Sequence, residues 1–204
     1  MAVKPRGFVP LRSLGGPVSF TTRRYRVSSG NTTSIFPGDA VRLLADGQVR
    51  RVRTSAATVA ELGVLGVVRN VLNSNGRPLT FSQPTNGPFL NASTAGYVDV
   101  YDDPDIVYQV NGTTSASAAY MGRFCRVTAA TYNSAAGISG LRIETADVTS
   151  SAVGHQFQII GIAPSERIGS LTVDGESVSS ADLEVRIANH TYRRVNGLVG
   201  GGTV

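Results

Sequence analysis

Four aspartates fall within seven residues, at Asp99, Asp102, Asp103 and Asp105, and form the densest set of potential ligands or catalytic acids in the chain. Several carboxylates on one loop suit calcium, and a pair of carboxylates can hydrolyse a glycosidic bond. The spacing, however, lacks the alternating ligands and distal glutamate of a calcium loop. Asp favours turns and Pro presets φ. We therefore predict a turn at 102–104, with a metal site as the alternative reading and catalysis as the remaining one.

The other candidates for chemistry are two histidines and one cysteine. His155 and His190 lie 35 residues apart, with no nucleophile signature beside either, so we expect packing or surface roles for both. Cys125 lies between Arg123 and Arg126, which could lower its pKa and make it reactive. A lone cysteine in an apolar strand is more typically a small buried side chain, and this is our prediction. A single cysteine excludes an intramolecular disulfide and a cysteine-based zinc site.

Basic residues are concentrated near the N-terminus. Residues 1–53 carry a formal charge of +8 and residues 54–204 carry −3, and eighteen of the nineteen basic residues are arginines. Arginine suits interfaces with carboxylates or phosphates, so the pattern indicates an acidic partner, either nucleic acid or an acidic protein face. Aromatic residues, on which bases would stack, make up only 7% of the chain, which favours the protein face.

The chain divides into three parts by composition. Residues 1–17 hold three prolines, three glycines and isolated apolar residues, which predicts an extended basic arm. Residues 18–192 read as about ten short strands, with turn signals every 8–12 residues and Asp46-Gly47 and Asn75-Gly76 as hairpin turns. Residues 193–204 form a glycine-rich tail. We predict an all-β fold, an antiparallel β-sandwich or barrel with many short strands, built as one body or as two packed subdomains, and at most one or two short helices.

Five segments resemble the capsid decoration (cement) proteins of tailed bacteriophages. Their order and spacing carry the resemblance, which spans roughly residues 35–190, and none is a catalytic signature. The most specific parts are the Asp-Asp-Pro strand pair and the Val-Arg-Ile-x-x-His ending. The segments are 36–47 (FPGDAVRLLADG), 62–68 (LGVLGVV), 97–110 (YVDVYDDPDIVYQV), 157–162 (FQIIGI) and 183–190 (LEVRIANH).

The resemblance implies a structural virion protein on the outside of the capsid, made in the host cytoplasm, that clamps neighbouring major capsid protein subunits. We expect no enzymatic activity and no cofactor, a homo-oligomer (trimer or dimer) on the capsid, no contact with membranes and none with nucleic acid. The alternative is a carbohydrate- or receptor-binding β-module of a phage tail or surface fibre, against which the lack of Trp counts. The predicted capsid-binding residues are Lys4, Arg6, Phe8, Arg12, Leu14, Arg23, Arg24 and Arg26.

Overall fold

The fold is seen in a computed structural model of the chain. It describes residues 7–15, 20–52, 54, 63–80, 88–114, 116–129, 137–162, 171–173, 176–178 and 182–192. Within these ranges the chain is all-β, and every pairing between named strands is antiparallel, which confirms the predicted fold class. The helical elements there are two single 3-10 turns, η2 (Ala118–Tyr120) and η3 (Thr145–Asp147). No helix in the described residues is long and apolar enough to cross a membrane.

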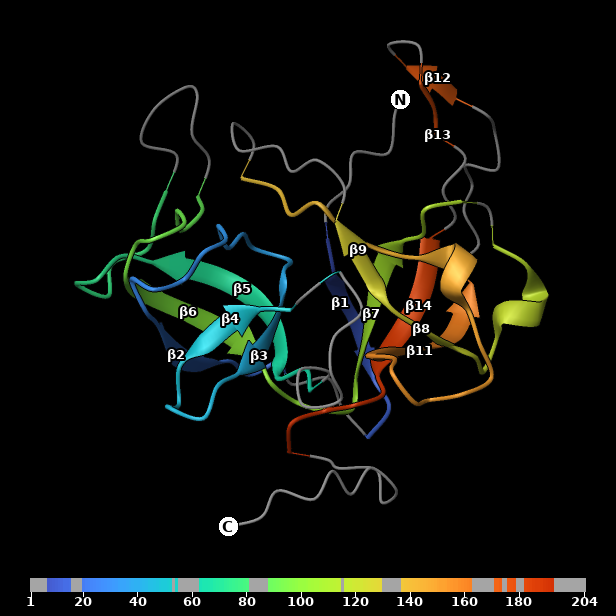
Figure 1. Ribbon diagram of the computed structural model, residues 1–204, viewed down its shortest axis with the longest axis horizontal. Coiled ribbons are helices and arrows are strands. Elements are labelled where there is room, and N and C mark those ends of the chain that lie inside the picture. The colour runs from blue at the N-terminus through green and yellow to red at the C-terminus, as the bar shows by residue number, and fades with distance from the viewer. Residues whose placement is uncertain are drawn as a thin grey trace.

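Two five-stranded sheets form the two halves of the molecule (Figure 1). The first sheet has the order β1 (Val9–Ser13), β7 (Ile106–Asn111), β14 (Asp182–Ile187), β11 (Phe157–Ile162), β8 (Phe124–Cys125). The second has the order β2 (Arg23–Val27), β6 (Gly96–Tyr101), β5 (Gly66–Leu72), β3 (Ala40–Leu43), β4 (Val49–Arg51). Two hairpins complete the strands, β9 (Val127–Ala129) with β10 (Leu141–Ile143), and β12 (Leu171–Val173) with β13 (Glu176–Val178).

Both predicted hairpin turns are confirmed. Between β3 and β4, Gly47 has φ +77° and the Asp46 carboxylate accepts a hydrogen bond from the Gln48 backbone at 3.0 Å. After β5, Gly76 has φ +74°, and the backbone N–H of Asn73 donates to the backbone carbonyl of Arg77 at 2.9 Å. Glycine adopts positive φ without the steric cost that a Cβ brings, which is why each turn closes at this residue.

The predicted turn at the aspartate cluster is also confirmed, but it does not close a hairpin. β6 belongs to the second sheet and β7 to the first, so the turn carries the chain from one half of the molecule to the other. Asp103 stabilises the turn by accepting a hydrogen bond from the Asp105 backbone at 2.9 Å. In β6 buried and half-buried residues alternate, so one face of the strand is buried, whereas in β7 five of the six residues are buried and both faces are covered.

The molecule has two hydrophobic cores, and one of them joins the halves. One lies within the second sheet, whose edge strands β2 and β4 contact each other, so that the sheet curls around side chains such as Val41, Val71 and Val98. The other core is built on the first sheet but includes Ala40, Val52, Val64 and Val67 from the second half. Because this core draws on both sheets, the two halves pack as one body.

Candidate functional site

The N-terminal segment is integrated into the body from Gly7 onward. Phe8 is 2% exposed, its ring stacks on Phe157 with centroids 4.7 Å apart, and it meets Tyr108 edge-on at 6.3 Å. Its backbone N–H donates to the carbonyl of Gly38 at 2.9 Å. The prediction that Phe8 binds a partner is therefore wrong, because its side chain fills the core of its own chain.

Strand β1 forms one edge of the first sheet and pairs with β7. The prediction that residues 1–17 form an extended arm is therefore wrong for the described residues 7–15, which belong to the folded body. A bulge between Pro10 and Arg12 interrupts its pairing with β7. Bulges re-aim side chains, and the extra residue here, Leu11, is 43% exposed. Leu14, which follows the strand, is 46% exposed while its backbone N–H donates to the carbonyl of Asp105 at 2.9 Å. Two neighbouring leucines thus face solvent from a fixed backbone.

Three of the predicted binding arginines already have acidic partners within the chain. Arg12 pairs with Glu184 at 2.7 Å, and Arg24 pairs across the β2–β6 ladder with Asp99 at 2.9 Å, which raises the pKa of Arg24. Arg23 lies 3.5 Å from Asp102. The folded chain therefore places acids of its C-terminal three-quarters against three cations of the basic front, so part of the charge that looked uncompensated along the sequence is matched.

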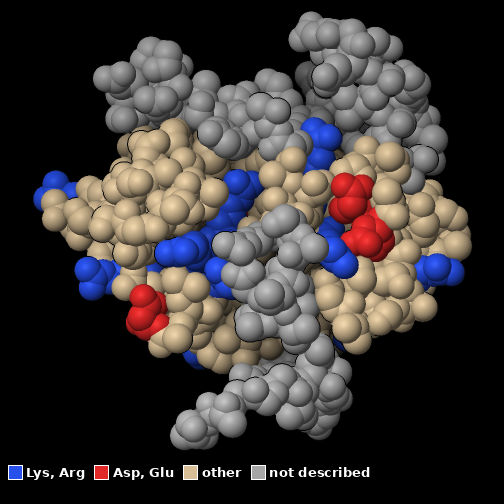
Figure 2. Space-filling model, in the orientation of Figure 1, with Lys and Arg blue, Asp and Glu red and all other residues tan. Residues whose placement is uncertain are grey.

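The remaining predicted cations differ in accessibility. Arg26 is exposed on β2 and has no ion-pair partner among the described residues. Lys4 and Arg6 lie outside the described residues. On the face shown in Figure 2, basic side chains gather on the half that holds the second sheet and along its boundary with the first. The surface therefore still offers cations to an acidic partner, although fewer than the sequence suggested.

The most specific parts of the sequence resemblance meet in space. The Asp102 carboxylate accepts a hydrogen bond from the Tyr25 hydroxyl at 2.7 Å, and the Tyr25 and Tyr192 hydroxyls lie 3.1 Å apart. His190 is 1% exposed, and its Nδ1 accepts from the Tyr192 backbone at 3.1 Å. Burial lowers the pKa of His190, while the backbone of Leu65 and the charge of Asp102 oppose that change.

This group of residues fastens the end of β14 to the second half of the molecule. The backbone of Val64, just before β5, donates to the carbonyl of Asn189 at 2.9 Å and accepts from the amide of Thr191 at 2.9 Å. We call Tyr25, Asp102, His190 and Tyr192 the clasp. Among the described residues, no group of three or more His, Cys, Asp or Glu side chains is placed to hold a metal ion.

A second joint forms around Asp39, which is fully buried. Its carboxylate accepts hydrogen bonds from the Ser139 hydroxyl at 2.5 Å and the Phe36 backbone at 2.9 Å, and lies 3.3 Å from Nε of Arg51. Burial raises the pKa of Asp39, and the Arg51 charge opposes that rise. Gly38, with φ +86°, lets the loop fold back so that Asp39 reaches its partners. The sequence offered no signal for Ser139 as a partner, because it lies 100 residues away.

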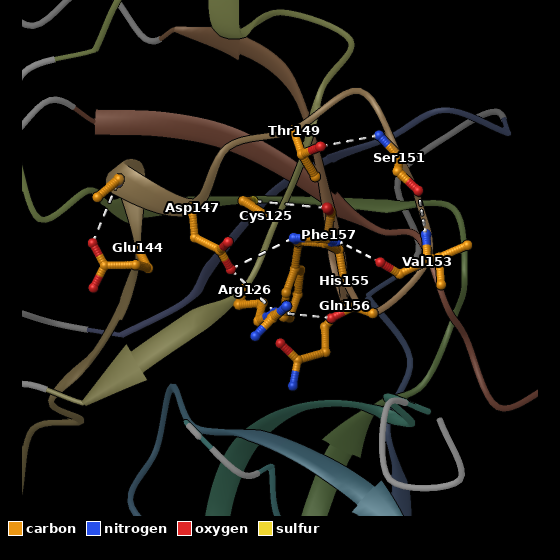
Figure 3. A network of polar contacts seen from close by, with 12 residues as sticks. Cys125, Arg126, Glu144, Asp147, Thr149, Ser151, Val153, His155, Gln156 and Phe157 are labelled. Atoms are coloured by element: carbon orange, nitrogen blue, oxygen red, sulfur yellow. Dashed lines mark hydrogen bonds and ion pairs between the residues drawn. The ribbon is translucent and has the colours of Figure 1, made fainter. Parts of the chain in front are cut away.

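His155 and Cys125 lie in a network of polar contacts at the far edge of the first sheet (Figure 3). Nδ1 of His155 contacts the carbonyl of Val153 at 2.8 Å, and its Nε2 lies 3.5 Å from Asp147. Nδ1 is thus hydrogen-bonded within its own loop, and the carboxylate of Asp147 is the charged group that Nε2 faces. Cys125 is buried, as predicted, and burial raises the pKa of its thiol. Its Sγ contacts the carbonyl of Phe157 at 3.7 Å.

Comparisons with known proteins identify no relative. No protein-family model matches the chain, no curated protein matches it, and no solved structure matches its fold.

Proposed function

We propose that this chain is a structural virion protein that binds the outer surface of a bacteriophage capsid and cements neighbouring major capsid protein subunits. The observation that carries the proposal is where the five resembling segments lie. Segment 36–47 forms the Asp39 joint, β3 and the Asp46-Gly47 turn, and 97–110 forms β6, the crossing turn and β7. Segment 183–190 forms β14 and ends in the clasp. Three of the five resembling segments thus lie on elements that join the two halves, while 157–162 forms β11 inside the first sheet.

A body joined in this way suits a protein that bears load between capsid subunits. Its two halves share a core, and the clasp and the Asp39 joint connect them at two further places. Closely packed interiors resist deformation and transmit strain. A clamp needs this property, because two capsid subunits pulling apart would otherwise separate its halves.

The attachment surface we propose consists of Leu11 and Leu14 on the β1 edge and the exposed arginines of β2, with Leu14 and Arg23 both contacting the 102–105 turn. Leu11 and Leu14 supply apolar anchors, and Arg23 and Arg26 supply cations for an acidic capsid face. Arg23 is 72% exposed, so its pairing with Asp102 is weak and can be exchanged for a partner's carboxylate. Binding should therefore rest mainly on apolar contact and weaken only moderately with salt, which screens charges beyond about 8–10 Å.

Co-sedimentation with empty shells of the major capsid protein encoded in the same genome tests the proposal. Wild-type protein should pellet with the shells to saturation. Leu11→Asp combined with Leu14→Asp should weaken binding roughly tenfold or more, because truncated anchors each cost more than about 1 kcal/mol. Met121→Asp is the matched control, since Met121 is 56% exposed and lies just before β8, at the opposite edge of the sheet.

Two results would contradict the proposal at different levels. Failure of the wild-type protein to pellet with shells would overturn capsid binding itself. Equal binding by the wild type and the double leucine variant would leave capsid binding in place and remove the β1 edge as its anchor.

A further inference from the structure

A shallow depression of about 290 Å³ lies where β1, at the edge of the first sheet, meets the second half of the molecule. Its walls include Val9 and Pro10 from β1, Pro37 from the loop before β3, and Val68, Arg69 and Tyr101 from β5 and β6. Pockets for small molecules span about 300–1,000 Å³ and enclose their ligand. An open hollow at the lower end of that range fits one or two side chains of another protein better than a metabolite.

Arg69 is the single charged residue among the described residues that line this depression. It is the extra residue of a bulge in β5, between Val68, which pairs with Val100, and Asn70, which pairs with Asp99. The bulge turns its side chain outward, and the guanidinium carbon lies 6.0 Å from the centre of the Tyr101 ring. A cation over a ring face is held in place while its N–H donors stay available.

Arg69, like Arg26 of β2, has no carboxylate partner in the part of the chain that the structure describes. Arg12, Arg23 and Arg24 each have a carboxylate within 4 Å, whereas Arg69 has none among the described residues. An exposed guanidinium fixed at the mouth of an apolar hollow is complementary to an apolar side chain with a carboxylate next to it.

We infer that this depression receives a loop of the major capsid protein, with an apolar side chain in the hollow and an adjacent Asp or Glu paired with Arg69. The inference rests on the proposed function and deepens it by naming the chemistry of the partner's contact. Arginine binds carboxylates through two parallel N–H donors, which gives the contact a defined geometry. Nucleic acid fits less well, because a phosphate backbone is met by several cations and the described lining provides one.

The test compares charge-reversed variants in the shell-binding assay. Arg69→Glu should weaken binding at least tenfold, because it sets like charges against each other. Arg77→Glu is the matched control, since Arg77 is also an exposed arginine of the second half but lies in the turn after β5, outside the depression. Tyr101→Leu keeps the wall apolar and removes the ring under Arg69, so it should weaken binding by about two- to fivefold. Circular dichroism and the urea midpoint of each variant establish that it is folded.

Each outcome decides the inference. Equal binding by Arg69→Glu, Arg77→Glu and wild type would overturn it while capsid binding stands. Loss of binding by both glutamate variants alike would also overturn it, since a general charge effect would then explain the result. Competition by single-stranded DNA for the Arg69 surface would replace the carboxylate partner with a phosphate. Failure of wild-type protein to bind shells would instead overturn the proposed function, and with it the partner named here.

Discussion

Replacing Phe8 by alanine tests whether the N-terminal segment is part of the folded body. The side chain is 2% exposed and packs against Phe157 and Tyr108, so Phe8→Ala removes a ring from a closed core. Buried Phe→Ala changes cost about 3–5 kcal/mol, which includes the cavity left behind. For a chain of this size, that loss lowers the melting temperature by about 6–20 °C.

Urea denaturation, followed by circular dichroism and intrinsic tyrosine fluorescence, measures this cost. Leu11→Ala is the control from the same strand, because Leu11 is 43% exposed and its truncation should change the free energy of unfolding by less than about 0.5 kcal/mol. If Phe8→Ala cost no more than Leu11→Ala, residues 7–13 would not be packed in the core. The segment would then be the extended arm that its composition suggests.

Two further predictions concern the joints between the halves. Asp39→Ala leaves the Arg51 charge buried without its partner and should cost about 3–5 kcal/mol of unfolding free energy, whereas Arg24→Ala, which breaks an exposed pair, should leave the urea midpoint nearly unchanged; equal effects would contradict the burial of the joint. Because burial lowers the pKa of His190 below its usual 6.5, the unfolded chain binds more protons, so stability should fall as pH drops below about 6.5 until the folded-state pKa is reached. His190→Gln should flatten this part of the pH profile, and an unchanged slope would show that another group is responsible.

Local features of the fold could be predicted from the sequence. Alternation in 97–101 and 183–187 marks strands with one buried face. In the structure, every second residue of β6 and of β14 is buried and the residues between them are half-buried. The Asp46-Gly47 and Asn75-Gly76 turns are set by a residue that tolerates positive φ. Such signals lie within a few residues of one another, so a sequence window contains them.

The pairing of strands far apart in the chain could not be predicted from the sequence. β1 pairs with β7 nearly 100 residues away, and no local period in 9–13 announces it, because Pro10 and the bulge at Leu11 break the alternation. The burial of Phe8 depends on Phe157, from a strand still further along the chain. The charge of residues 1–53 looked unmatched for the same reason, since Arg24 finds Asp99, and Arg12 finds Glu184, only after folding.

Electron microscopy of capsid shells with and without the added protein tests capsid binding most directly. We expect ordered extra density on the outer surface at the contacts between neighbouring subunits, into which the two-sheet body fits with the β1 edge toward the shell. Shells whose reconstruction is unchanged at saturating protein, or density confined to the shell interior, would contradict it.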